Sequence, residues 1–357
     1  MTAAMFARSA AGIVAKFERI QFDSGAWEKM LNGFADRIVF QTPAWLAFVA
    51  ETQRGEIVLA ALKEGNEILG CFSGVMIKKL GLKILGSPFR GWSSPYMGFN
   101  LNPTVPRRVA AAAMPEFAFR ELGCIHFEIV DADMHPDDIQ GLGFAHEMHA
   151  TLEVDLTQDE KALFDRMHSV CRRNLRQAEK RGVIIEEAQD PAFADEYAEQ
   201  LKDVFAKQGL VPNYGAARVR ALIKHLQPTG ALLLLRARDP GGRCIATGIY
   251  PALNRTAYYW GGASFREYQG FRPNEMLHWS AMRHWKRRGI QSYNMVGTMG
   301  FKQKFGGQET SVAMISGSRY QWLSRLRFVA PKIGRAVLHA IWKLKPSPKA
   351  KAEETDE

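Results

Sequence analysis

The sequence predicts an α/β protein made of two similar units, each with a mixed sheet flanked by helices. Two observations carry this prediction. Apolar runs of strand length occur in pairs around polar turns, and each pair is followed by a helical segment, a glycine and another strand. This order of elements occurs once in each half of the chain, which indicates an internal duplication.

The first copy contains a hairpin whose polar turn includes Gly65. A helix before it is expected to begin at Thr42 and Pro43, because threonine is a good N-cap and proline suits the first helical position. An alanine-rich helix follows the hairpin, ends at a glycine and leads into an apolar strand. In order, the hairpin, helix, glycine and strand are 57–62 with 68–77, 107–122, Gly123 and 124–130.

The second copy repeats this order around the polar turn 238–243. An aromatic strand precedes its helix, and a loop rich in glycine, lysine and phenylalanine closes it. Two further helices lie upstream of this copy. The predicted elements are the helices 191–207 and 216–226, the hairpin 231–237 with 244–251, the strand 256–261, the helix 274–288, Gly289, the strand 292–296 and the loop 300–307.

A long helix, 158–181, is predicted between the two copies, with Thr157 and Glu160 as a capping box and Gly182 as its end. Its second half is basic, and cations spaced four residues apart share one helix face. This face is either a phosphate-binding surface or a solvated basic surface. The cations are Arg172, Arg173, Arg176 and Lys180.

These elements divide the chain into a first domain, 1–155, and a second domain, 156–320, which includes the basic linking helix. The remaining residues, 321–357, combine a basic amphipathic segment, 322–345, with a polar tail. The amphipathic segment is expected either to lie on the inner face of an anionic membrane or to pack on the protein.

Composition restricts the class of protein. The 357 residues are 46% apolar and 24% charged, which is typical of a soluble globular protein. No apolar run reaches the roughly 18 residues of a membrane span, and residues 1–20 do not form a signal peptide, so we expect a cytoplasmic protein.

The net charge of +10 favours anionic partners, with a merely basic surface as the alternative. The four scattered cysteines are expected to be reduced structural thiols.

Six motifs, in their order and spacing, resemble one family. They are FQTPAWL (40–46), GSPFRGWSSPYMGF (86–99), CRRNLRQAEKRGV (171–183), YYWGGAS (258–264), RPNEMLHWSAMRHWKRRGI (272–290) and GFKQKFGG (300–307). Over residues 35–316 the chain resembles FemAB-type peptidyltransferases, the FemAB-like branch of the GNAT acyltransferase superfamily. The resemblance implies two tandem GNAT-like domains with a substrate cleft between them.

The resemblance also implies a function. An acyl or aminoacyl group would be transferred to an amine of a cell-envelope precursor, which is a peptidoglycan, polysaccharide or lipid intermediate. The donor would be aminoacyl-tRNA or acyl-CoA, and no cofactor would be bound tightly. Two alternatives are kept: an acyl-CoA-dependent acetyltransferase acting on an amino sugar or small amine, and a non-catalytic protein that binds RNA or an envelope-assembly partner.

By the resemblance, Lys302 falls on the lysine of the family's FK motif and becomes the candidate catalytic residue. It would contact a donor phosphate or the developing oxyanion. Lys304 is the second candidate, while Phe301 and Phe305 would fix the loop or stack on a base. The alternative is that Lys302 is an ordinary loop lysine.

Donor phosphates would meet the basic helix face and the start of the helix at 274. An ordinary GNAT domain offers backbone N–H groups there, but this turn keeps only Gly270 and contains Pro273, which argues against the usual coenzyme A mode. The residues assigned to the donor are Arg172, Arg173, Arg176, Lys180, Arg272, Asn274, Phe301, Lys304 and Phe305.

Arg90, Trp92 and Tyr96 lie on the loop expected to face the acceptor, although aromatic residues there also serve to cap a core. No general base is identified, and Glu267 and Asp131 are the candidates. A lone histidine pair without a third ligand predicts no metal site. That pair is His146 and His149, and the residues expected to be structural are His278, His284, Tyr258, Tyr259 and Trp260.

Overall fold

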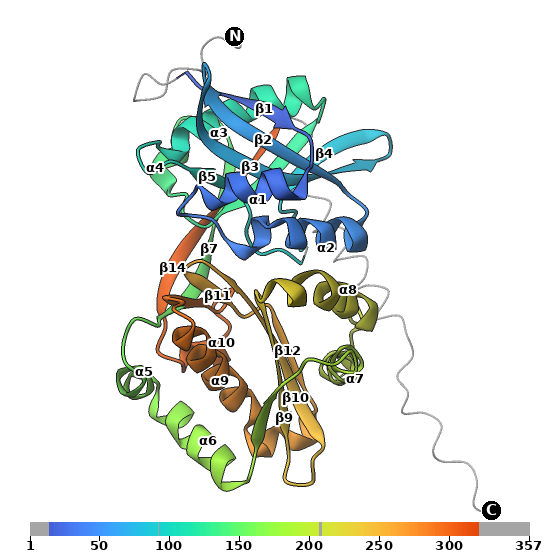
Figure 1. Ribbon diagram of the computed structural model, residues 1–357, viewed down its shortest axis with the longest axis vertical. Coiled ribbons are helices and arrows are strands. Elements are labelled where there is room, and N and C mark those ends of the chain that lie inside the picture. The colour runs from blue at the N-terminus through green and yellow to red at the C-terminus, as the bar shows by residue number, and fades with distance from the viewer. Residues whose placement is uncertain (1–13, 92, 207–208, 321–357) are drawn as a thin grey trace, which may run out of the picture.

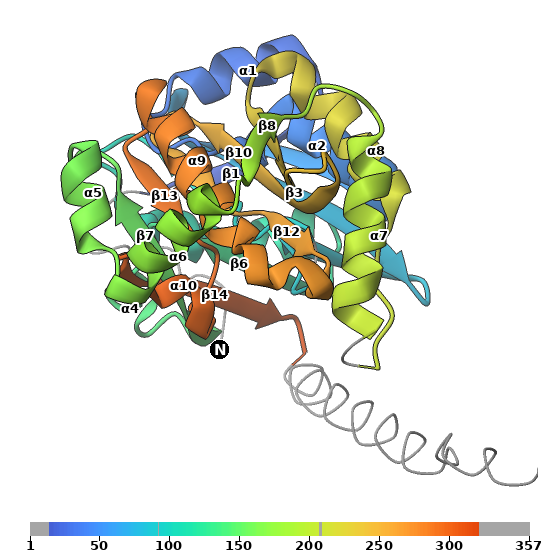
Figure 2. The same cartoon turned by 90° about the horizontal axis from the view of Figure 1, so that it is seen from below.

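The computed structural model describes residues 14–91, 93–206 and 209–320, which form two lobes stacked along the long axis of the molecule (Figure 1). In each lobe, helices cover a twisted sheet, so the predicted α/β class with two sheet-and-helix units is confirmed. Figure 2 shows that α6 and α9 lie on one side of the second-lobe sheet, whereas α7 and α8 lie on the other.

The first lobe is built mainly from antiparallel strands, with one parallel pair, β4 and β6, at the side that faces the rest of the sheet. Its strands are β1 (Lys16–Ile20), β2 (Glu56–Glu64), β3 (Glu67–Lys79), β4 (Leu82–Ser87), β5 (Phe99–Leu101) and β6 (His126–Asp131). Its helices are α1 (Ser24–Asn32), η2 (Val39–Gln41), α2 (Pro43–Gln53), α3 (Arg107–Glu116), η3 (Phe117–Glu121) and α4 (Pro136–Ile139).

The second lobe has the parallel pair β11 and β13 at its centre. Its strands are β8 (Ile184–Glu187), β9 (Leu232–Arg238), β10 (Cys244–Leu253), β11 (Thr256–Tyr258), β12 (Gly261–Ser264) and β13 (Ser292–Asn294). Its helices are α5 (Glu160–Arg166), α6 (Ser169–Lys180), α7 (Phe193–Ala206), α8 (Ala216–Leu226), η4 (Gln227–Thr229), η5 (Arg266–Phe271), α9 (Pro273–Arg287) and α10 (Gly300–Gln303).

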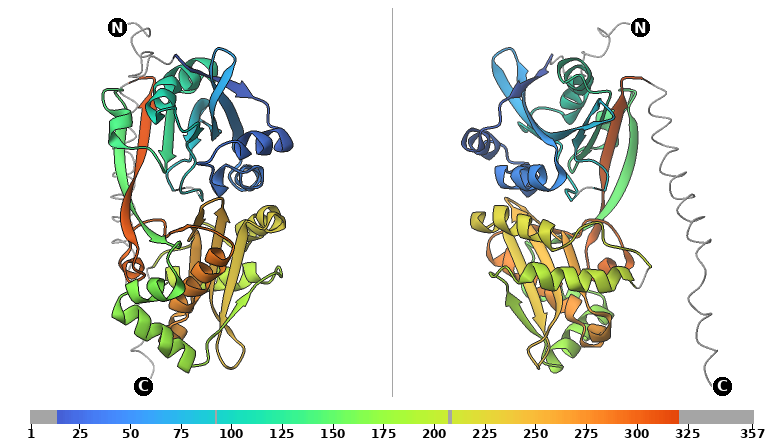
Figure 3. Two further views of the ribbon diagram at one scale, coloured as in Figure 1. Left: turned by 60° about the vertical axis from the view of Figure 1, so that its left-hand side comes forward. Right: turned by 90° about the vertical axis from the view of Figure 1, so that its right-hand side faces the viewer.

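Two long strands connect the lobes. β7 (Ala145–Asp155) leaves the first lobe, and β14 (Gln308–Ser318) returns from the second and pairs antiparallel with it (Figure 3). The far end of β14 also pairs with β6, so the last described strand completes the first-lobe sheet. The strand order is β1-β2-β3-β4-β6-β14-β7-β13-β11-β10-β9-β8, with β5 beside β3 and β12 beside β10. The proposed boundary at residue 155 therefore separates units that share one sheet.

An aromatic cluster joins the lobes where they face each other. The rings of Phe40 and Tyr258 lie 4.6 Å apart, and those of Tyr96 and Tyr258 lie 5.9 Å apart. The indole Nε1 of Trp260 also donates a hydrogen bond to the Ser93 carbonyl at 2.6 Å. Buried aromatic contacts of this kind fix the position of one lobe on the other.

Most predicted elements are confirmed, including both hairpins and the glycines at 123 and 289, which have φ of 68° and 83°. Three predictions are wrong. The helix 158–181 is two helices, because the chain turns at Met167 and the N–H of His168 bonds to the Lys304 carbonyl. Asp159, and not Thr157, caps the first of them. The strand 256–261 is split between β11 and β12.

Arg107, at the start of α3, is a charged centre of the first lobe. Its guanidinium lies 2.8 Å from the Asp36 carboxylate, 3.0 Å from Asp131 and 2.9 Å from Asp133. Asp131 is 1% exposed, and this burial raises the pKa of its carboxyl to about 6 in spite of Arg107.

Replacing Arg107 by Gln should destabilise the fold by about 3–5 kcal/mol, because buried carboxylates would lose their cation. The neighbouring Arg108 bonds only to an exposed carbonyl, so Arg108→Gln should cost less than about 1 kcal/mol. Denaturant unfolding of both variants measures the difference. Equal stability would show that the three aspartates do not depend on Arg107.

Candidate active site

A gap in the second-lobe sheet opens where two neighbouring strands separate. β11 pairs in parallel with β13, from Thr256 opposite Ser292 to Tyr258 opposite Asn294. Beyond Tyr258 the chain bends away, and β12 pairs with β10 instead. The chain that follows Asn294 therefore has no strand partner on the side of β11. Its backbone polar groups on that side need other partners.

Lys302, on the short helix α10, fills this gap. Its Nζ donates hydrogen bonds to the carbonyls of Met295 and Val296 at 2.7 and 2.6 Å and lies 5.4 Å from the ring centre of Tyr259. The residue is 5% exposed, and no carboxylate in the described chain forms an ion pair with it. Burial disfavours the ammonium and lowers the pKa of Lys302 to about 8.

The turn that presents these carbonyls is tightly fixed. The Asn294 side-chain oxygen accepts hydrogen bonds from the Val296 N–H at 2.8 Å and from the Thr151 hydroxyl at 2.9 Å. The Gly297 N–H in turn donates to the Thr151 hydroxyl. Val296 has φ of 53°, a strained conformation for a β-branched residue that the surrounding bonds must hold in place.

A cavity of about 260 Å³ adjoins this turn and contacts both lobes. Arg218 of α8 is its cation: the guanidinium donates to the Ser93 hydroxyl at 3.3 Å and stacks 5.3 Å from the Tyr214 ring. None of the described lining residues is acidic. They are Gly91, Ser93, Pro95, Asn213, Tyr214, Arg218, Trp260 and Val296.

This arrangement has a chemical consequence. Cations close to a bound amine lower the pKa of its ammonium form, which favours the neutral nucleophile. The same cations stabilise negative charge on a carbonyl oxygen during addition. Val296 links Lys302, which bonds its carbonyl, to the cavity that contains Arg218, and two cations in this arrangement suit the attack of an amine on an activated carbonyl.

The other residues of the closing loop have different environments. Lys304 forms an ion pair with the nearly buried Glu275 at 2.7 Å, so its charge is already compensated. Phe305 is buried against His278, whereas Phe301 is partly exposed beside Tyr259. His278 shares a hydrogen bond with the Tyr293 hydroxyl, and burial lowers the pKa of its imidazole to about 3, as a structural residue requires.

The basic residues of α6 have different contacts. Arg172 donates to the carbonyls of Asp165 and Met167 and thereby stabilises the end of α5. Arg176 stacks on Phe164, 5.5 Å from its ring centre, with its guanidinium on the exposed surface. Arg173 and Lys180 are exposed, without an ion pair in the described chain.

The end of α6 does lie beside the start of α9. Arg272 reaches Gln177 at 3.4 Å, and Arg181, which the sequence did not single out, bonds to the Gly270 carbonyl. Asn274 bonds to the Ser264 hydroxyl at 3.2 Å. Two arginines, Arg181 and Arg272, therefore lie at the N-terminus of α9, where a phosphate was predicted to bind.

The turn before α9 differs from a phosphate-binding loop. η5 is a 3₁₀ turn in which the N–H groups of Tyr268 and Arg272 bond to carbonyls within the turn. Pro273 at the first helical position contributes no N–H. Side chains would have to supply most of the contacts to a donor phosphate.

The residues predicted for the acceptor are only partly placed near this site. Tyr96 bonds to Asn294 at 3.4 Å, whereas Arg90 forms an ion pair with Glu147 on β7. Trp92 lies outside the described residues, as does the segment 322–345.

Neither candidate base suits that role. The oxygens of Asp131 accept bonds from Arg107 and from two backbone N–H groups, while Glu267 is exposed on η5.

His146 and His149 lie on β7, and no group of three or more metal-ligating side chains occurs in the described ranges. The four cysteines are free thiols, as predicted. None of the helices in the described part is long and apolar enough to cross a membrane.

Comparison with known proteins identifies the type of fold. Residues 165–303 match the family described as Acetyltransferase (GNAT) domain. A comparison with curated proteins gives no match. The chain is similar to the crystal structure of FemX, with a TM-score of 0.70 at 14% identity over 87% of this chain and 99% of that one.

Two further structures are similar over nearly their whole length. A tandem GNAT protein from the clavulanic acid biosynthesis pathway has a TM-score of 0.53 at 10% identity and covers 85% of this chain and 98% of its own. L-PGS from Bacillus licheniformis has a TM-score of 0.53 at 11% identity, with 86% and 96% covered. These similarities confirm the predicted fold of two tandem GNAT-like domains, and residues 165–303 match an acetyltransferase domain family.

Lys302 should titrate well below the ordinary lysine pKa of 10.5, at a pKa of about 8. NMR of the chain labelled with ¹³C at lysine Cε measures this directly, and Lys302→Met assigns the resonance. If every lysine resonance titrates above about 10, the Lys302 ammonium is better hydrated than its burial indicates.

Proposed function

We propose that this acyltransferase of FemAB-like GNAT fold moves an acyl or aminoacyl group from an activated ester or thioester to an amine of a cell-envelope precursor. One observation supports the proposal: a buried ammonium, Lys302, bonds to the carbonyl of Val296, and Val296 also lines a cavity that contains Arg218 and no described acidic side chain. That combination favours a neutral amine and an anionic tetrahedral intermediate.

The reaction balances without a protein nucleophile. The amine nitrogen of the acceptor attacks the donor carbonyl, forming the N–C bond and an oxyanion. The C–O or C–S bond to the donor then breaks, and the proton from the amine goes to the departing oxygen or sulfur. Lys302 would stabilise the oxyanion with the N–H that its two carbonyl bonds leave free.

Aminoacyl-tRNA is the donor that we favour. The N–H groups of Arg266, Tyr268 and Arg272 at the turn before α9 already have acceptors, while exposed cations on α6 and at Arg272 suit an extended phosphate backbone. The name of a similar structure, putative lysylphosphatidylglycerol synthetase, supports an envelope acceptor. In this proposal the first lobe holds the acceptor, and the segment 322–345 contacts the inner face of the membrane.

The second candidate is an acyl-CoA-dependent acetyltransferase, which the description of the matching family favours. A protein that binds RNA or an assembly partner without catalysis is a third. Hydroxylamine, a small amine that needs no acceptor pocket, separates the three. Hydroxamate formation above the uncatalysed rate is measured with aminoacyl-tRNA and, separately, with acetyl-CoA.

Lys302→Ala should lower hydroxamate formation by about 10²–10³-fold, the usual cost of losing one oxyanion donor. Lys304→Gln, in the same loop, should lower it by less than tenfold because Lys304 is already paired with Glu275. Circular dichroism melting of both variants controls for folding. Unchanged activity in a folded Lys302→Ala variant would refute its role, and no transfer from either donor would favour the non-catalytic alternative.

Reversing exposed charges tests the nucleic-acid donor. Arg176→Glu and Lys180→Glu should each weaken tRNA binding and reduce the slope of log affinity against log salt by about 1. Lys202→Glu, an exposed lysine on α7 across the sheet, is the matched control and should leave the slope unchanged. A slope that no α6 variant alters would leave that helix as solvated surface.

A further inference from the structure

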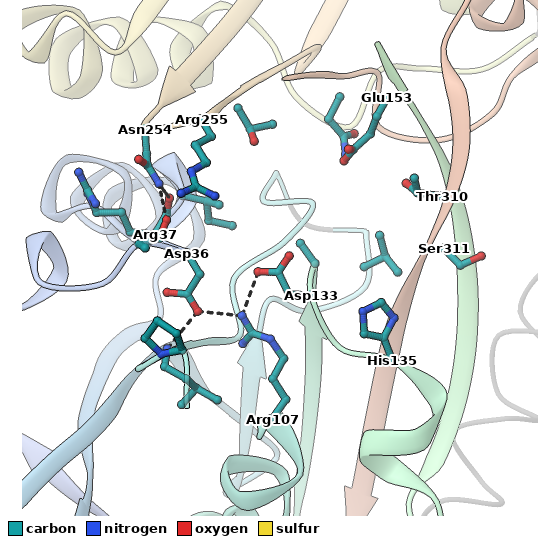
Figure 4. Close-up of a pocket in the computed structure, with 18 of the residues that line it drawn as sticks. Asp36, Arg37, Arg107, Asp133, His135, Glu153, Asn254, Arg255, Thr310 and Ser311 are labelled. Carbon is teal, nitrogen blue, oxygen red and sulfur yellow. Dashed lines mark hydrogen bonds and ion pairs between the residues drawn. The ribbon is translucent and has the colours of Figure 1, made fainter. Parts of the chain in front are cut away.

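A second and larger cavity, of about 810 Å³, lies between the lobes and has no lining residue in common with the cavity beside Lys302. Residues of α3, β7, β14 and the segment between β10 and β11 surround it (Figure 4). The two cavities have a common boundary, since Asn294 lines the larger one and Val296 the smaller.

One group of charges in this cavity is already paired. Arg107 forms ion pairs with Asp36 and Asp133, as the dashed lines in Figure 4 indicate. These side chains form one wall of the cavity, and each already has a partner of opposite charge.

Three other charged residues of this cavity, Arg37, Glu153 and Arg255, have no ion pair in the described chain, and Arg37 donates a hydrogen bond only to the Phe34 carbonyl. Glu153, on β7, has no cation among the described residues, and Arg255, which follows β10, has no side-chain hydrogen bond or ion pair there. Figure 4 shows them on different walls, Arg255 beside Asn254 and Glu153 near Thr310. The cavity therefore presents a carboxylate on one wall and the guanidinium groups of Arg255 and Arg37 on another, and a ligand could neutralise charges on both walls.

Glu153 is also held in a fixed orientation. The Asn294 amide donates to one of its oxygens at 2.8 Å, and the Ser292 hydroxyl lies 3.4 Å from the other. Asn294 is itself fixed by its bonds to Thr151 and Val296. A half-buried carboxylate that is oriented in this way binds an ammonium more strongly than a mobile surface carboxylate does, because less side-chain entropy is lost.

We propose that this cavity binds a small zwitterion, an amino carboxylate whose ammonium meets Glu153 and whose carboxylate meets Arg255. Ligand binding at this site does not depend on the acyl-transfer reaction. A cationic ligand would leave Arg255 uncompensated, and an anionic one would leave Glu153 uncompensated. A zwitterion compensates the charges of both Glu153 and Arg255.

Isothermal titration of the full chain with ω-amino acids tests this proposal, without any acyl donor present. Glycine, 4-aminobutyrate and 6-aminohexanoate vary the separation of the two charges. Hexylamine and hexanoate each keep one charge and match the longest probe in size. The best zwitterion should bind about tenfold or more tightly than either single-charge analogue.

Two variants assign the charges. Glu153→Gln should reduce zwitterion affinity about tenfold and abolish the advantage over hexanoate. Arg255→Gln, at an exposed position, should reduce it about threefold and abolish the advantage over hexylamine. Glu309→Gln and Arg266→Gln, exposed residues that do not line the cavity, are the matched controls and should bind as the parent does.

The proposal is overturned if no zwitterion binds, if zwitterions bind no better than the single-charge analogues, or if the preference survives in both folded variants. Melting temperatures confirm folding, and Arg255→Gln remains informative if Glu153→Gln is unstable. A chain that binds zwitterions yet transfers no acyl group would refute the proposed function and leave this inference standing.

Discussion

The separation of β12 from β13 leaves backbone carbonyls inside the protein without a strand partner, and the rest of the site depends on how they are satisfied. A buried carbonyl without a donor costs about 1–3 kcal/mol. Lys302 supplies the donors for Met295 and Val296, and in doing so it brings an ammonium to the open end of the sheet. The same bonds serve the fold and place the charge that the proposed function requires.

Asn294 extends this constraint to the lobe interface. Its amide orients Glu153, and its carbonyl oxygen holds the turn at Val296, so both cavities depend on one side chain. Tyr96 reaches the same oxygen from the first lobe. Substitutions at Asn294 would therefore disturb both cavities together, whereas Arg218 and Arg255 each report on one.

The sequence predicted what depends on local pattern. Paired apolar runs around Gly65 and the 238–243 turn define hairpins, and Gly123 and Gly289 end helices, because these signals act over a few residues. The motif 300–307 indicated a loop whose lysine, Lys302, is buried in the structure, and its catalytic role stays a prediction. The break at His168 was not predictable, since its partner is the distant Lys304 carbonyl. Arg218 and Glu153 depend on partners distant in sequence, Ser93 for the first and Asn294 for the second, and no local signal marks them.

The return of β14 to the first lobe has a consequence for the order of synthesis. The strand that pairs with β6 includes Ser318, so the first-lobe sheet lacks a member until almost all of the described chain has been made. During translation β6 presents an unpaired edge, which is a site for incorrect association. The nascent first lobe must wait for the second, and the two are expected to mature as one cooperative unit.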